Sequence, residues 1–326
     1  MHGHDIIVIG ASAGGVEALP RALKQLPKNF PAAFFVVLHV SPANESYLPK
    51  ILARSSSLPA VHPNDGDHIE KGKIYVAPPD NHLWLKNSSV RVTKGPRVNR
   101  HRPAVDPLFE SAAHVYGPRV VGVILTGSLD DGTTGLHTVK ECGGVAIVQN
   151  PEDALVPSMP QSAMQFVEVD HVLPLPKIRP LLIQLSKQKI KNLKIQCPEK
   201  VRFDMETAMM TPDEMEKKCG PPSSFICPEC NGPLWEIRHG AVSNYRCLVG
   251  HSFSPEALIA EEGEALERAL WIAVKTLEER STILRRMSNR AREMEQVYSC
   301  QSFEEKAKEA ERDARVIKKI LKTINC

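Results

Sequence analysis

Short apolar runs rich in β-branched residues alternate with segments of helical period over about the first 186 residues. The strongest runs cover residues 6–9, 34–38, 120–125 and 145–148. Apolar runs of this kind, separated by helices, are typical of a parallel sheet buried on both faces. We therefore predict a doubly wound, mostly parallel α/β domain of three layers over residues 1–186. Shorter strands at 74–78 and 82–92 suggest a hairpin at the sheet edge.

The remaining chain divides into three further segments. Residues 187–224 are Lys-rich and then contain Met and Pro without a sustained period, which is typical of a linker. Residues 225–253 form a compact cysteine and histidine module. Residues 254–326 carry heptad-like apolar stripes that predict two helices, arranged as an antiparallel hairpin or as a dimerising coiled coil.

Helix-start signals give expected boundaries for these two helices. Ser254 followed by Pro255 supplies an N-cap with proline at the first helical position. Ser302 and Glu305 have the spacing of a capping box, so we expect the second helix to start there.

Composition limits the classes of function. The chain has 326 residues, 42% of them hydrophobic, and a formal net charge of +3. A nearly neutral chain of this kind indicates a globular protein with no nucleic-acid partner. Its apolar runs are too short for a signal peptide or a membrane span, so we expect a cytoplasmic protein with no membrane insertion.

A glycine-rich turn, Gly-Ala-Ser-Ala-Gly-Gly at 10–15, follows the first strand. Such a turn can bind a phosphate or hold the Ser12 hydroxyl as a nucleophile. A dinucleotide site requires an acidic residue after the second strand, but His39 stands there. A serine nucleophile needs an imidazole that takes its proton and an acid that orients this imidazole. Two candidate acids, Asp130 and Asp131, follow the strand at 120–125. Hydrolysis is therefore favoured over cofactor binding.

These segments resemble the catalytic domain of the CheB family, the chemotaxis protein-glutamate methylesterases, over about residues 5–186. The matching segments are 9–15, His39, 98–106, 123–127, Asp131 with Gly132, and Gln149 with Asn150. The resemblance implies that Ser12 is the nucleophile, His39 the general base and then acid, and Asp131 the residue that orients the imidazole. It also implies a Rossmann-like sheet and no cofactor for catalysis.

Two positions depart from the family pattern. Ala13 stands where threonine is frequent, and Ser128 stands where the family has a methionine whose backbone amide helps to bind the oxyanion. Because a backbone N–H survives both changes, we expect the oxyanion site to persist and the substrate fit to differ. The chain starts at the catalytic strand, so we expect no receiver domain that controls the site in cis.

Four residues have the spacing of a tetrahedral metal site. Cys227 and Cys230 form one pair, and Cys247 and His251 form a second pair sixteen residues later. Four protein ligands leave no open position, so we predict a structural zinc that lets a very small module fold. The other five cysteines carry no recognisable spacing and are interpreted as incidental.

The predicted function is that of a serine hydrolase acting on glutamate methyl esters of a chemotaxis-type receptor or another methyl-esterified protein. The resemblance adds glutamine deamidation as a side activity. Two alternatives stay open: a hydrolase for a different ester or amide, and a signalling scaffold with a vestigial triad. Arg100 and Arg102 lie in a basic run that is either a solvated loop or a dock for an acidic receptor helix. The helical tail could bind a signalling partner.

Overall fold

The computed structural model describes residues 3–190, 197, 211–239 and 242–324. Seven strands form a parallel sheet in the order β3-β4-β2-β1-β7-β8-β9. Their bounds are β1 Ile6–Ala11, β2 Ala33–Leu38, β3 Ala60–Val61, β4 Ile74–Val76, β7 Val120–Ile124, β8 Val145–Gln149 and β9 His171–Leu173. The chain builds the sheet outward from β1 on one side and then returns to add β7 on the other. This reversal between β1 and β7 is a topological switch point, where ligands bind in open α/β sheets.

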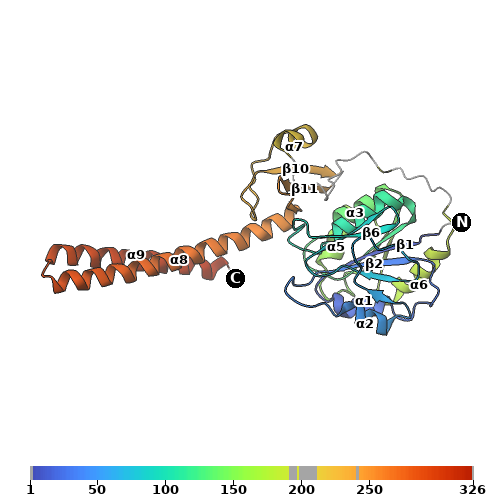
Figure 1. The fold of residues 1–326 in the computed structure, drawn as a ribbon, viewed down its shortest axis with the longest axis horizontal. Helices are drawn as coiled ribbons and strands as arrows, with labels where there is room; N and C mark the ends of the chain where they lie inside the picture. The colour runs from blue at the N-terminus through green and yellow to red at the C-terminus, as the bar shows by residue number, and fades with distance from the viewer. Residues whose placement is uncertain (1–2, 191–196, 198–210, 240–241, 325–326) are drawn as a thin grey trace. The chain divides into compact units, whose positions relative to one another are not determined.

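Two layers of helices cover the sheet. One layer contains α1 (Gly15–Ala22), α2 (Leu48–Ser55) and α6 (Leu175–Lys187), and the other contains α3 (Val105–Tyr116), α4 (Thr133–Glu141) and α5 (Ser158–Phe166) (Figure 1). A short 3-10 turn, Gly117–Arg119, leads into β7. Successive residues of β1 pack into opposite layers because side chains alternate across a strand. The predicted three-layer fold is confirmed.

The expected hairpin between the strands at 74–78 and 82–92 was wrong, because the chain from His82 onward folds into a hairpin of its own. β5 (His82–Lys86) and β6 (Ser89–Thr93) make a separate antiparallel sheet of two strands. β5 packs against helix α3 instead of extending the main sheet, and Leu83, Leu85 and Val90 join the core beneath that helix. β4 in turn lies inside the main sheet, between β2 and β3.

The cysteine and histidine module is a second, smaller sheet. Its strands are β10 (Leu234–His239), β11 (Val242–Cys247) and β12 (Ser252–Phe253), paired antiparallel in that order. The predicted linker, 187–224, lies partly outside the described residues and contains helix α7 (Pro212–Cys219). Thr211 and Glu214 start α7 with reciprocal capping contacts. The described part of this segment therefore contains a capped helix that its composition does not predict.

The C-terminal residues 259–326 form a compact unit of their own. Helix α8 (Pro255–Glu293) starts at the predicted proline, whereas α9 (Val297–Ile324) starts five residues before the predicted Ser302. Contacts of Glu278 with Lys318 and of Ser288 with Cys300 show that the helices run antiparallel. Of the two arrangements expected for the apolar stripes, the chain forms the hairpin. No helix among the described residues is long and apolar enough to cross a membrane.

Candidate active site

Ser12 and His39 lie next to each other at the carboxyl ends of neighbouring strands. Ala11 of β1 is paired with Leu38 of β2, and the two candidate residues directly follow this pair. The His39 amide donates to the Ala11 carbonyl at 3.1 Å, and the Ser12 amide donates to the Thr126 carbonyl after β7 at 3.0 Å. The register of three central strands therefore positions Ser12 at the switch point.

Glycines at two positions allow the turn that carries Ser12 to approach the loop after β7 closely. Gly14 precedes α1 with φ of 82°, a left-handed conformation that residues with a Cβ rarely adopt. A Cβ placed on Gly127 would lie 2.8 Å from the Ser12 Cβ and 2.0 Å from the Met159 sulfur. Ser12 therefore packs directly against the loop that leads to Asp131.

His39 and Asp131 form a buried hydrogen bond. Nε2 of His39 donates to Oδ2 of Asp131 at 2.7 Å, and the two side chains are only 5% and 2% exposed. The Asp131 carboxylate also accepts from the amides of Val105 (2.6 Å) and Asp106 (3.3 Å). Burial pushes the pKa of Asp131 upward, but the hydrogen bond and charge of His39 outweigh it and lower the pKa to about 2. Asp131 is therefore held as a carboxylate that orients the imidazole.

The second ring nitrogen of His39 is left for a proton transfer. Nδ1 is buried and has no hydrogen-bond partner among the described residues, and Ser12 Oγ makes no hydrogen bond there either. An imidazole that is fixed through one nitrogen and unoccupied at the other can accept a proton from a neighbouring hydroxyl. Such contacts are frequently loose before the substrate binds.

Two exposed backbone amides flank the serine. Ala13 and Ser128 are both exposed, and their N–H groups donate to no acceptor within the described part of the chain. The Thr126 hydroxyl holds the Ala13 carbonyl at 2.9 Å, so the backbone of the serine turn is tied to the loop after β7. Unoccupied amides beside a serine hydroxyl are the arrangement that an oxyanion site requires.

Comparison with known proteins agrees with this geometry. The family model described as CheB methylesterase matches residues 7–182. The chain belongs to the CheB methylesterase family. A relative from Leptospira interrogans is 39% identical over 190 residues, which are 58% of this chain and 98% of the relative.

Longer relatives match over the same CheB domain. The protein-glutamate methylesterase/protein-glutamine glutaminase of Thermotoga maritima is 40% identical over 184 residues, and one from Anaeromyxobacter dehalogenans is 38% identical over 183 residues. The chain spans about half of their length, 54% in both cases. The crystal structure of the Thermotoga maritima CheB methylesterase catalytic domain superposes with a TM-score of 0.53 at 39% identity, over 56% of this chain and 98% of that one.

Three residues of the CheB site were not identified as site residues from the sequence. Asn99 donates to Asp131 at 2.9 Å and to Asp106 at 2.7 Å. The His101 ring stacks on the His39 ring at 3.6 Å between centroids, and burial followed by the charge of His39 lowers the His101 pKa to about 3. All three lie in the family segment 98–106, but only the fold shows that they surround Asp131.

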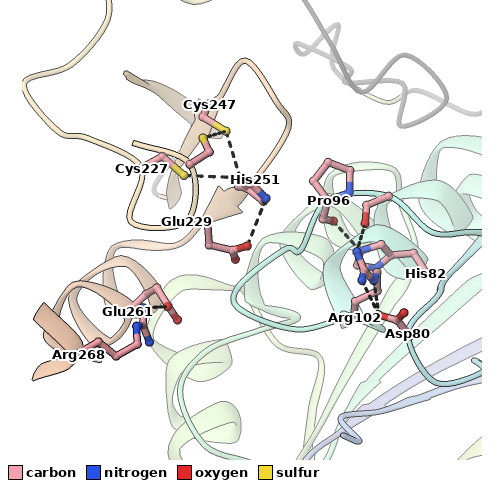
Figure 2. A network of polar contacts seen from close by, with 12 residues as sticks. Asp80, His82, Pro96, Arg102, Cys227, Glu229, Cys247, His251, Glu261 and Arg268 are labelled. Atoms are coloured by element: carbon pink, nitrogen blue, oxygen red, sulfur yellow. Dashed lines mark hydrogen bonds and ion pairs between the residues drawn. The ribbon is translucent and has the colours of Figure 1, made fainter. Parts of the chain in front are cut away.

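Asp80 neutralises part of the basic run. Figure 2 shows Arg102 beside Asp80, to which its guanidinium donates, and Arg102 also donates to the Gly95 carbonyl. Lys94 pairs with the same Asp80 at 2.6 Å. His82 bridges the Pro96 carbonyl and the Ala104 amide, and burial lowers its pKa to about 4. Arg102 therefore stabilises the loop, whereas Arg100 is half-buried with a left-handed φ of 72°. Docking of substrate at Arg100 stays a prediction.

The four predicted metal ligands converge in space. Their donor atoms, from Cys227, Cys230, Cys247 and His251, all lie within 4.8 Å of one another. Nδ1 of His251 is 3.6 Å from the sulfurs of Cys227 and Cys247, while its Nε2 faces the Glu229 carboxylate at 3.2 Å (Figure 2). A carboxylate on the far nitrogen is the usual support for a metal-binding histidine.

One pair of cysteines interpreted as incidental is bonded. Cys142, at the end of α4, forms a disulfide with Cys197, 55 residues later. Their Cα atoms are 4.4 Å apart. The interpretation was wrong for this pair because the contact is made by the fold, and no local spacing announces it.

Proposed function

We propose that the chain is a protein-glutamate methylesterase that uses Ser12, His39 and Asp131. The observation that carries the proposal is the buried hydrogen bond between His39 and Asp131 beside Ser12 at the β1/β7 switch point. The names of the relatives from Thermotoga maritima and Anaeromyxobacter dehalogenans support the substrate class.

The reaction runs through an acyl-enzyme. His39 removes the Ser12 proton as Oγ attacks the ester carbonyl, and the amides of Ala13 and Ser128 stabilise the oxyanion. The intermediate collapses by breaking the bond to the methoxy oxygen, and His39 returns the proton so that methanol leaves. Water then attacks the acyl-serine with His39 as base, which releases the glutamate carboxylate and restores Ser12. Asp131 stabilises the imidazolium in both halves.

A glutamine side chain can enter the same sequence. Its amide would form the same acyl-enzyme and release ammonia in place of methanol, which fits the glutaminase activity in the relatives' names. A different ester or amide substrate is the alternative that the exposed Ala13 and Ser128 leave open. A scaffold with a vestigial triad is disfavoured, because two backbone amides hold the Asp131 carboxylate, which in turn hydrogen-bonds His39.

The test is release of methanol from methyl-labelled receptor in membranes. Ser12→Ala should lower the turnover by about three orders of magnitude or more. Ser41→Ala, a serine on the exposed loop after β2, serves as the matched control and should retain full turnover. Equal, slow methanol release by the wild type and Ser12→Ala would refute the esterase proposal. Ammonia release from glutamine-containing receptor is measured in parallel.

We also infer that the four-residue cluster of the module binds a structural zinc ion. Three thiolates and one imidazole suit tetrahedral Zn²⁺, and no ligand position is left for a substrate. Metal analysis of the purified protein should find close to one zinc per chain. Cys230→Ser should lose the metal, whereas Cys300→Ser, which lies in α9, should keep it. A binding partner for the helical hairpin stays a prediction.

A further inference from the structure

The cysteine and histidine module of residues 225–253, here called the Cys/His module, contacts a loop that hydrogen-bonds Asp131. Asn99 and Arg100 form a tight turn between Val98 and His101, with φ of 48° and 72°. Both central residues are left-handed, as in a type I′ turn, where asparagine is favoured. β12 of the module runs along this turn, since the Ser252 carbonyl accepts from the Asn99 amide at 2.8 Å.

Asn99 is bonded on both sides. Its side-chain NH₂ bridges Oδ1 of Asp131 and Oδ2 of Asp106, and its Oδ1 accepts from the Ser254 amide at 2.8 Å. The side chain is only 2% exposed. Two buried carboxylates this close repel each other unless a donor lies between them. Asn99 therefore supplies the contact that keeps Asp131 in place next to the buried Asp106.

We propose that Asn99 is a positioning residue for Asp131 and that the metal-loaded Cys/His module sets the position of Asn99 through Ser252 and Ser254. The proposal rests on the hydrolase function proposed above. It states that metal binding in the module controls the position of Asp131 in the triad. Metal at Cys247 and His251 closes the short loop that leads directly into β12, so loss of the metal frees both contacts to Asn99.

The module supports the site and does not cover it. Its contacts reach the Asp131 loop, Asn99 and, through Asn244, the start of α4 at Thr134. Ala13 and Ser128, which flank the nucleophile, stay exposed. Metal removal should therefore lower activity, whereas an inhibitory cover would raise activity when it is released.

Kinetics of Asn99→Ala and Asn99→Asp in the full chain test the positioning role. Both should lower kcat for methanol release by about tenfold or more with KM nearly unchanged, because the residue acts through Asp131 and not on the ester. Asn99→Asp keeps the shape but places a third carboxyl beside two others. Asn87 is a matched control, since it is exposed and also left-handed, with φ of 54°, in the β5–β6 turn. Asn87→Asp should retain the wild-type kcat.

Chelation of the metal tests the link to the module. It should lower kcat of the wild type but add little to the loss in Asn99→Ala, because both changes break the same contact. If the two losses multiply, the module does not act through Asn99. Unchanged kcat in Asn99→Ala overturns the positioning role, while absence of Ser12-dependent methanol release refutes only the esterase function.

Histidine ring NMR gives a measurement that needs no substrate. In protein with ¹⁵N-labelled histidine, the His39 signals are assigned by their loss in His39→Gln. They should shift on chelation and in Asn99→Ala, and should not shift in Asn87→Asp. His39 signals that stay unchanged on chelation would overturn the proposal.

Discussion

The CheB domain and the Cys/His module hold their chemical groups in place by different means. In the CheB domain, two large apolar layers on the faces of one sheet fix the strand register that brings Ser12 and His39 together. Among the described residues, the module contributes four residues to its core cluster, two of them the candidate ligands Cys227 and Cys247, and α8 adds Ala257 and Leu258. A core of that size is too small to fold a domain alone. The first site is built by packing, whereas the second depends on the zinc ion that we propose for it.

Removal of the metal should give the largest difference between the two regions. Binding of structural zinc contributes on the order of 10 kcal/mol to the folding of such modules. Cys227→Ser should therefore abolish the hydrogen-exchange protection of β10 and β11, while amides of β1 and β2 stay protected. Cys219→Ser, outside the cluster, is the control. Equal protection of β10 and β11 in both variants would show that the module folds without metal.

Asp131→Asn should have the next largest effect, and only in the CheB domain. An amide cannot stabilise the imidazolium and selects the wrong tautomer of His39, so kcat should fall by about 10⁴, or about 5 kcal/mol. Zinc content should not change. Asp130→Asn is the control and should cost far less, because Asp130 bonds Ser254 and not His39. A larger loss of kcat in Asp130→Asn than in Asp131→Asn would show that Asp131 is not the triad aspartate.

Gly127→Ala should cost about 1–3 kcal/mol of stability, since a new Cβ meets the Ser12 Cβ and the Met159 sulfur in a packed region. Ser12 would be displaced, so kcat should fall as well. In the helical hairpin, Gly263 lies within α8 with open space around it, and Gly263→Ala should stabilise by up to about 1 kcal/mol. Thermal unfolding measures both signs. Two changes of the same sign would contradict the packing argument.

The same contrast explains what the sequence could predict. Ser12, His39 and Asp131 follow strong apolar strands, and side chains at the ends of parallel strands meet at one rim, so pattern and topology predicted that they lie close together. The choice of Asp131 over Asp130 came from the resemblance to the CheB family. The candidate metal ligands are local in sequence, so their spacing alone predicted the cluster that the structure brings together. Asn99 lies in an irregular loop, and its contacts to Asp131 and Ser254 span 32 and 155 residues. No periodicity encodes such contacts.

Local signals failed where tertiary packing decided the outcome. The Ser302 and Glu305 capping box is a good helix start, yet α9 begins at Val297 because Cys300 already packs against Ser288 of α8. Tertiary contacts also decide the Cys142–Cys197 disulfide and the separate β5–β6 sheet, which local sequence did not predict. In each case the deciding contact joins segments that are distant in sequence.

Ser254→Ala should have the smallest effect, at the point where the two regions meet. The Ser254 hydroxyl caps α8 by accepting from the Ala257 amide at 3.0 Å and donates to Asp130 at 2.7 Å. Loss of the cap should cost about 1 kcal/mol. Burial, opposed by the hydrogen bond from the Ser254 hydroxyl and assisted by the nearby Glu256, raises the pKa of Asp130 to about 7. Because the Ser254 hydroxyl lowers this pKa, its loss in Ser254→Ala should raise the pKa of Asp130 above the wild-type value.

The raised pKa of Asp130 makes the stability of the protein depend on pH. Because the pKa of Asp130 is higher in the folded than in the unfolded chain, its contribution is present below about pH 4 and is lost as the pH rises through about 7. In Ser254→Ala that loss should move to higher pH, as measured by NMR titration of the carboxyl group. Thr211→Ala removes the comparable cap of α7 and should leave the Asp130 titration unchanged. An Asp130 midpoint that falls in Ser254→Ala would mean that the hydroxyl does not stabilise the carboxylate.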